Sequence, residues 1–466
     1  MKEKAKVKLS VIKGEKLFNE NTPFVINIFS PESKKMKKNS NADLICVIDI
    51  SGSMAGSKIA LVKKSLKVLV ELMDKNDRLA LILFNETGKK IFDLNYLTKE
   101  IKNNYYAQIN EIKAEGGTSI MRGLEIAIDI LQNDVDKNKP NRASSILLLS
   151  DGCDNNYNDF ELGKKLKDLT KGKNLNFTIN TFGYGNDHDP KVMQKLASIR
   201  DGSFFYVKEY AKVAEFFGVV LGTCVSVVAN KASLVVELLN KKCSIKKIFG
   251  KEYLFSHDIT SHYFNTTMLH FISGKEFSYV LEFEINVKDV KIGEDLLAVD
   301  FIYQDEKNNF CKESIIYKYC LTDINYAKAN EEYIRSQVCF VVEQSLKLRE
   351  DNRVNEAKKS LNEMKDWLIK NNKNNDNNKM YLEDINKALE YYKSKSKITN
   401  IERADISNRV FEKQKKIVSS ERMIYSTRAQ SYYSKSSTER MSRPEYKQEK
   451  QEKDEIKPNK KNCLIF

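Results

Sequence analysis

The sequence predicts an α/β fold: a doubly wound domain with a parallel sheet, then an antiparallel β-sandwich and a C-terminal helical region. Residues 44–48 and 146–149 are short apolar runs, which are typical of strands buried on both faces of a parallel sheet. Apolar residues recur at helical spacing over 59–73 and 120–131. From 233 to 321, short alternating strands succeed one another without helical periods, which favours the sandwich.

The composition is that of a folded protein with more than one domain. The chain has 466 residues, of which 41% are hydrophobic, so it is long enough for two or three domains. The formal net charge is +14, but no nucleic-acid motif accompanies the scattered lysines, and nucleic-acid binding is not favoured. The eight cysteines include no CxxC pair, which argues against zinc fingers and RING-type modules.

The pattern divides the chain into five segments. Strand-like runs in 1–42 are expected to pair with the later β domain, because two strands alone are marginally stable. The α/β domain is expected over 43–229 and the β-sandwich over 230–322. A helical region follows over 323–420, and apolar periodicity then fades over 421–466, which predicts a disordered tail.

The sequence also predicts where the protein is located. The N-terminus has no apolar segment of the signal-peptide type. The longest uncharged stretches fall short of the roughly 20 apolar residues that a membrane-spanning helix needs. We therefore expect a cytoplasmic protein with reduced thiols.

Side chains with oxygen atoms follow the ends of two predicted buried strands. Asp49, Ser51 and Ser53 follow the first strand, and Asp151 follows the strand at 146–149. Thr118 lies in a Gly-Gly-Thr loop before a predicted helix. Open α/β sheets bind ligands at the carboxyl ends of their strands, so we expect these side chains to converge there.

The five side chains together predict a metal site. Each has a structural explanation when taken alone, because serines commonly cap helices and Asp-Gly commonly forms a turn. As a set they form an all-oxygen, hydroxyl-rich shell, which suits Mg²⁺ or Mn²⁺ in octahedral geometry.

The pattern of Asp49, Ser51, Ser53, Thr118 and Asp151 resembles the metal-ion-dependent adhesion site (MIDAS) of von Willebrand factor A (VWA) domains. Such domains have a Rossmann-like doubly wound fold. The resemblance implies that the two serines bind the ion directly, and that the threonine and the aspartates bind it directly or through water. It also implies that a carboxylate of a protein partner fills the remaining position.

The order of the segments resembles the intracellular VWA proteins of plants and protists and, more distantly, inter-α-trypsin inhibitor heavy chains. The resemblance covers about residues 7–368 and rests on SGSMAGSKIALVKKSL (51–66), NDRLALILF (76–84), GGTSI (116–120), ILLLSDG (146–152) and TFGYGNDHD (181–189). Many plant members carry an N-terminal RING finger and act as ubiquitin ligases. The sequence contains no such module, so ligase activity is not carried over.

The last four residues, Cys463 to Phe466, form a C-a-a-X box, which predicts prenylation of Cys463. The terminal Phe favours a geranylgeranyl over a farnesyl group. The alternative is a chance cysteine near the end of a chain. One lipid gives only marginal membrane binding, so a second contact is needed, and a protein partner at the membrane would supply it. The protein is then peripheral on the cytosolic face of a membrane.

The leading hypothesis is a binding module and not an enzyme, in which Mg²⁺ captures an Asp or Glu of a protein partner. A metal-dependent hydrolase is disfavoured, because no nucleophile–base pair accompanies the ligands. Two alternatives stay open. One is a ubiquitin-system component or other enzyme-associated subunit, by family analogy, and the other is a scaffold whose site is empty.

Overall fold

The computed structural model describes most of the chain. The described residues are 7–30, 32, 38–134, 142–151, 154–184, 190–207, 212–251, 254, 256–305, 309–371, 377–392, 405–407, 409–410, 412–413 and 426–443. Within them, no helix combines the length and the apolar character that a membrane crossing requires.

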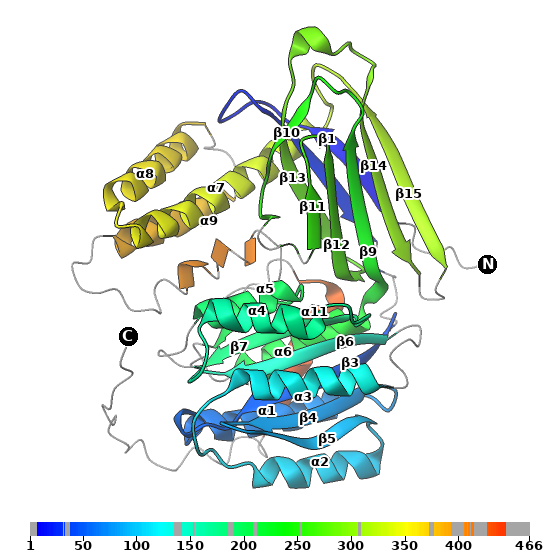
Figure 1. Ribbon diagram of the computed structural model, residues 1–466, viewed down its shortest axis with the longest axis vertical. Coiled ribbons are helices and arrows are strands. Elements are labelled where there is room, and N and C mark those ends of the chain that lie inside the picture. The colour runs from blue at the N-terminus through cyan, green and yellow to red at the C-terminus, as the bar shows by residue number, and fades with distance from the viewer. Residues whose placement is uncertain are drawn as a thin grey trace.

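A six-stranded sheet forms the centre of the first domain (Figure 1). Its strands in spatial order are β5 (Gly88–Tyr96), β4 (Arg78–Phe84), β3 (Asn41–Asp49), β6 (Arg142–Ser150), β7 (Phe177–Tyr184) and β8 (Phe204–Val207). All pairs are parallel except β4 with β5. The chain runs outward from β3 to β5 and then returns to β6 on the other side of β3. The carboxyl ends of β3 and β6 therefore flank the switch point at which such sheets bind ligands.

Helices cover both faces of this sheet (Figure 1). One face carries α1 (Ser57–Leu72), α2 (Lys99–Glu111) and α6 (Val213–Val225); the other carries α3 (Ile120–Asn133), α4 (Asp159–Thr170) and α5 (Pro190–Ile199). Strand β3 is buried on both faces: Leu44 and Cys46 join one core cluster, while Ile45 and Val47 join the other. This is the predicted doubly wound α/β fold, and the prediction is confirmed.

A buried ion cluster holds the amino ends of the central strands together. The guanidinium of Arg78 pairs with Asp43 on β3 and with Asp134 after α3, each at 2.8 Å. Arg142, which begins β6, also pairs with Asp43. Arg78 and Asp43 are almost fully buried, so each charge depends on its partners for stabilisation.

Two antiparallel sheets form the second domain. One contains β1 (Lys8–Lys13), β2 (Thr22–Phe29), β13 (Glu276–Glu284) and β10 (Ser244–Ile248); the other contains β11 (Ser256–Ile259), β12 (Tyr263–Ile272), β9 (Val227–Leu238), β14 (Asp295–Gln304) and β15 (Phe310–Lys318). Phe24 and Phe283 of the first sheet share a core with Leu234 and Phe301 of the second, so the sheets pack face to face. The N-terminal strands belong to this later domain, because β2 pairs with β13 along its full length.

Three helices pack together beside the sandwich: α7 (Tyr326–Glu350), α8 (Val354–Asn371) and α9 (Asn378–Tyr391). Val338, Leu361 and Ile385 are buried between them. Tyr333 of α7 is buried against the sandwich and donates a hydrogen bond of 2.6 Å to Glu282 of β13. The antiparallel sheets and the C-terminal helices of the predicted fold class are therefore present.

A further helix, α11 (Arg428–Met441), lies where the sequence predicted a disordered tail over 421–466. Thr427 and Gln430 form a capping box at its start. The helix packs on α6 at Gly218 and Gly222, where the two backbones approach closely: a Cβ on Gly222 would lie 2.6 Å from the Cα of Gln430. Contact through small residues leaves no stripe of large apolar side chains, so hydrophobic periodicity did not reveal this helix.

Candidate metal centre

The carboxyl end of β3 turns sharply and holds Asp49 in place. The Ser51 amide donates a hydrogen bond of 2.8 Å to Asp49 Oδ1, and the Ser150 hydroxyl donates one of 2.5 Å to Asp49 Oδ2. The hydroxyls of Ser51 and Ser53 lie 3.1 Å apart. Asp49 and Ser51 are buried, whereas Ser53 is exposed. The oxygen atoms of this turn therefore extend from the protein interior to its surface.

Hydrogen bonds link this turn to a second loop, and that loop to a third. The Gly52 amide donates to the carbonyl of Gly116 at 2.9 Å, which places the loop before α3 beside the serines. The Asn155 amide donates to the carbonyl of Thr118 at 3.0 Å, which attaches the loop after β6 to the same point. Thr118 itself is buried. The loops that carry all five predicted ligands therefore meet at one edge of the sheet.

Asp151 lies directly after β6 and is buried, and only one of its two carboxylate oxygens has a polar partner among the described residues. Its Oδ1 atom has no hydrogen-bond partner among the described residues. Its Oδ2 atom lies 3.4 Å from the ammonium of Lys58, which is in the first turn of α1. A buried carboxylate oxygen without a partner is costly, and a bound cation would remove that cost.

The electrostatics of the site also favour a cation. Burial, together with the nearby charge of Asp151, raises the pKa of the Asp49 carboxyl to about 6, although hydrogen bonds from Ser150 and Ser51 oppose the shift. Two carboxylates close together and out of water destabilise each other's charged form. A divalent cation between them would reverse that effect.

The residues present fit Mg²⁺ or Mn²⁺. Asp49, Ser51, Ser53, Thr118 and Asp151 offer oxygen donors only, and a hard cation prefers these. No group of three or more His, Cys, Asp or Glu side chains placed to hold a metal occurs in the described part of the chain. A site here would therefore depend on the hydroxyl groups.

Some residues at the site were not predicted from the sequence. Ser150 bonds to Asp49, and Lys58 bonds to Asp151. Glu86 accepts a hydrogen bond of 3.1 Å from the Gly117 amide and so positions the threonine loop. Ser150 is adjacent to a predicted ligand, which was an available signal. The remaining predicted functional residue, Cys463, lies outside the described residues.

Comparison with known proteins identifies the first domain. The sequence profile of the von Willebrand factor type A domain matches residues 43–219. An uncharacterized protein of Synechocystis sp. is 29% identical over 42% of this chain and 44% of its own length. Inter-alpha-trypsin inhibitor heavy chain H2 of Sus scrofa is 30% identical over 38% of this chain and 19% of its own length. The E3 ubiquitin-protein ligase WAV3 of Arabidopsis thaliana is 28% identical over 24% of this chain and 15% of its own length.

The chain thus spans less than half the length of each of these relatives. Among solved structures, the von Willebrand factor type A protein from Catenulispora acidiphila superposes with a TM-score of 0.63 at 15% identity, over 82% of this chain and 89% of that one. That likeness shows the fold, and the sequence profile shows the family of the first domain. Residues 43–219 of this chain are a von Willebrand factor type A domain.

Proposed function

We propose that the VWA domain binds a protein partner through Mg²⁺ held by Asp49, Ser51, Ser53, Thr118 and Asp151. VWA domains are protein-interaction modules, and this proposal adds the metal to that role. The observation that carries it is the buried Oδ1 atom of Asp151, which has no hydrogen-bond partner among the residues that the structure describes and lies near the carboxylate of Asp49 at the convergence of three loops.

The chemistry of the donors suits capture of a carboxylate. Three of the five donors are neutral hydroxyls, so they bind the ion without reducing its charge. Ser53 and Gly52 are exposed, and a partner can therefore approach the ion from that side. When bound, Mg²⁺ would act as a Lewis acid that attracts an Asp or Glu of the partner. The protein side chains hold the ion and orient its open side.

Thermal unfolding with and without Mg²⁺ tests the metal site, because an ion that binds only the folded protein raises its melting temperature. The wild type should be stabilised by Mg²⁺, and Asp151→Asn and Ser53→Ala should not. Asp168→Asn, an exposed aspartate of α4, is the matched control and should behave as the wild type. A wild type whose melting temperature is unchanged in millimolar Mg²⁺ and Mn²⁺ would refute the metal site.

Partner capture is tested separately. Proteins retained by the wild type in Mg²⁺ should be lost in EDTA and should not be retained by Asp151→Asn. The same partners retained under all three conditions would show that binding does not use the metal.

We also propose that Cys463 is prenylated and holds the protein on the cytosolic face of a membrane. Support comes from the C-a-a-X pattern of Cys463 to Phe466. Cys463→Ser should move the protein from the membrane fraction to the supernatant. Unchanged fractionation of that variant would refute the tether and leave the metal proposal untouched.

A further inference from the structure

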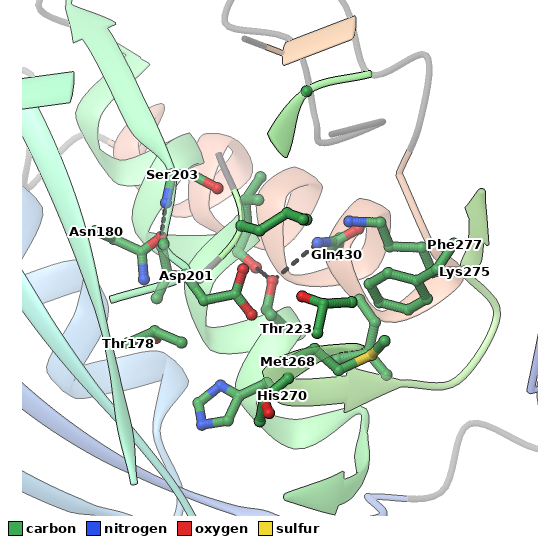
Figure 2. Close-up of a pocket in the computed structure, with 18 of the residues that line it drawn as sticks. Thr178, Asn180, Asp201, Ser203, Thr223, Met268, His270, Lys275, Phe277 and Gln430 are labelled. Atoms are coloured by element: carbon green, nitrogen blue, oxygen red, sulfur yellow. Dashed lines mark hydrogen bonds between the residues drawn. The ribbon is translucent and has the colours of Figure 1, made fainter. Parts of the chain in front are cut away.

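A cavity of about 140 Å³ lies at the junction of the VWA domain, the sandwich and α11 (Figure 2). Its walls include Thr178 and Asn180 near the start of β7, and Asp201 to Ser203 immediately before β8. The other walls come from α6, the loop after β10, β12, β13 and Gln430 of α11. The cavity is thus at the amino edge of the parallel sheet, opposite the carboxyl edge that carries the candidate metal centre.

His270 of β12 lines this cavity and is only 6% exposed. Neither of its ring nitrogens has a hydrogen-bond partner in the part of the chain that the structure describes. In Figure 2, His270 and Met268 lie on one side of the cavity, and Asn180, Asp201 and Ser203 lie on the other. A buried imidazole with two unused hydrogen-bonding atoms is costly unless something in the cavity meets them.

Several neighbouring polar groups, by contrast, are bonded to one another. Asn180 donates to Ser145 Oγ at 2.8 Å and accepts from the Ser203 amide at 2.9 Å. Thr223 accepts from Gln430 at 2.8 Å and donates to the carbonyl of Val219. These contacts fix the walls of the cavity and leave the imidazole of His270 as its clearest recognition group.

The imidazole is neutral near pH 7. Burial lowers the pKa of His270 to about 4, with Arg200 adding to the shift and Asp201 opposing it. Lys275 and Tyr279 also line the cavity, and the Lys275 ammonium lies 4.8 Å from the ring centre of Phe277. A neutral imidazole offers a donor at one nitrogen and an acceptor at the other, so it can bond to a molecule that carries either group.

The cavity also has aromatic and apolar walls. Phe205, Phe249, Phe277 and Tyr279 line the cavity together with Met268. Aromatic side chains favour a flat ring through stacked or edge-to-face contacts. An engineered apolar cavity of about 150 Å³ in another protein holds one benzene. The volume here therefore matches one five-membered or six-membered ring.

We propose that this cavity binds a small neutral heteroaromatic ring, which hydrogen-bonds to one ring nitrogen of His270 and packs against Met268 and Phe277. Single pyrimidine and azole rings have this chemistry. Water is the competing occupant, and about four molecules would fit at roughly 30 Å³ each. Each water needs two to four polar partners, and the polar wall residues Asn180, Thr223 and Gln430 already bond to other protein groups. The ring would contact the VWA domain and the sandwich at once, and so stabilise their junction.

Nuclear magnetic resonance of the histidine rings tests the site in the full-length protein, without Mg²⁺. The chain has four histidines, so the ring nitrogens of ¹⁵N-histidine-labelled protein can be resolved and assigned. Uracil, cytosine and pyrazole are the probes, each added to millimolar concentration. We expect at least one to shift the His270 nitrogens while leaving those of the exposed His257 unchanged. No shift at His270 with any of the three would overturn the proposal.

Two variants test whether binding depends on hydrogen bonding to His270 or only on the fit of the ring in the cavity. His270→Met keeps the bulk of the side chain but removes both hydrogen-bonding nitrogens, and should weaken binding of the responsive probe about tenfold. His257→Gln is the matched control and should bind as the wild type. Equal binding of the probe by the wild type and His270→Met, or equal binding of benzene and the probe by the wild type, would overturn the role of His270. If His270→Met does not fold, the comparison of benzene with the probe in the wild type still tests the role of His270.

Discussion

Replacing Lys58 by methionine is expected to tighten Mg²⁺ binding at the candidate metal centre. The Lys58 ammonium lies 3.4 Å from Asp151 Oδ2, and its side chain is only 13% exposed. It therefore competes with Mg²⁺ for the negative charge of the Asp151 carboxylate. At an effective dielectric constant of about 20, two unit charges at that distance interact by about 5 kcal/mol. The lysine regains hydration when it swings away, and that offsets most of this energy. We expect a net gain of about 1.4 kcal/mol, or tenfold in affinity.

Isothermal titration with Mg²⁺ at low ionic strength measures this change directly. Lys75→Met removes an exposed lysine between α1 and β4, and serves as the control for the change in net charge. Added salt should reduce the difference between Lys75→Met and the wild type more than that between Lys58→Met and the wild type, because buried pairs are screened less. An unchanged or weaker affinity in Lys58→Met would show that the lysine does not compete with the ion.

Three further predictions concern stability. Arg78→Met should lower the free energy of unfolding by about 3 kcal/mol in urea titrations, because it leaves the buried Asp43 short of a partner; a loss below 1 kcal/mol would mean that Arg142 suffices. Gly222→Leu should displace α11 and expose it to proteolysis, since even a Cβ there meets the backbone of Gln430; an unchanged digestion pattern would contradict the close packing. The pKa of His270 is lowered to about 4. Above pH 6.5 this histidine is neutral in both the folded and the unfolded protein, so its contribution to the free energy of unfolding does not change with pH. Between pH 6.5 and 4 the unfolded state alone gains a proton, so stability should fall by about 3 kcal/mol, and His270→Met should remove that part of the pH dependence; equal slopes for variant and wild type would refute it.

The sequence predicted those features that depend on short stretches of chain. Strand β3 was predictable because residues 44–48 are apolar at every position, as burial on both faces requires. Asp49, Ser51 and Ser53 follow at once, so their place at a strand end needed no long-range information. Only the meeting of their loop with Thr118 and Asp151 required the fold, and the resemblance to VWA domains supplied it.

Features made by contacts between distant segments were not predictable in this way. Helix α11 is stabilised by glycines of α6, some two hundred residues earlier, and its own pattern is polar. The cavity around His270 draws walls from the VWA domain, the sandwich and α11, and no local pattern marks that histidine. The ion pair of Lys58 with Asp151 likewise joins the first turn of α1 to the end of β6.

A test of Asp49 distinguishes a metal site from a structural turn. Burial and the charge of Asp151 raise the pKa of Asp49 to about 6, so its charged form is disfavoured in the metal-free fold. A raised carboxyl pKa stabilises the fold at low pH, and that contribution is lost as pH rises through 6. At pH 7 the charge then costs about 3 kcal/mol, from a shift of roughly two units. Asp49→Asn keeps an oxygen for the Ser51 amide and removes this cost. In EDTA it should therefore unfold at a higher urea concentration than the wild type, while losing all stabilisation by Mg²⁺. A purely structural carboxylate predicts the opposite, since replacing it would weaken the turn whether or not Mg²⁺ is present. A variant less stable than the wild type in EDTA would thus favour the structural role.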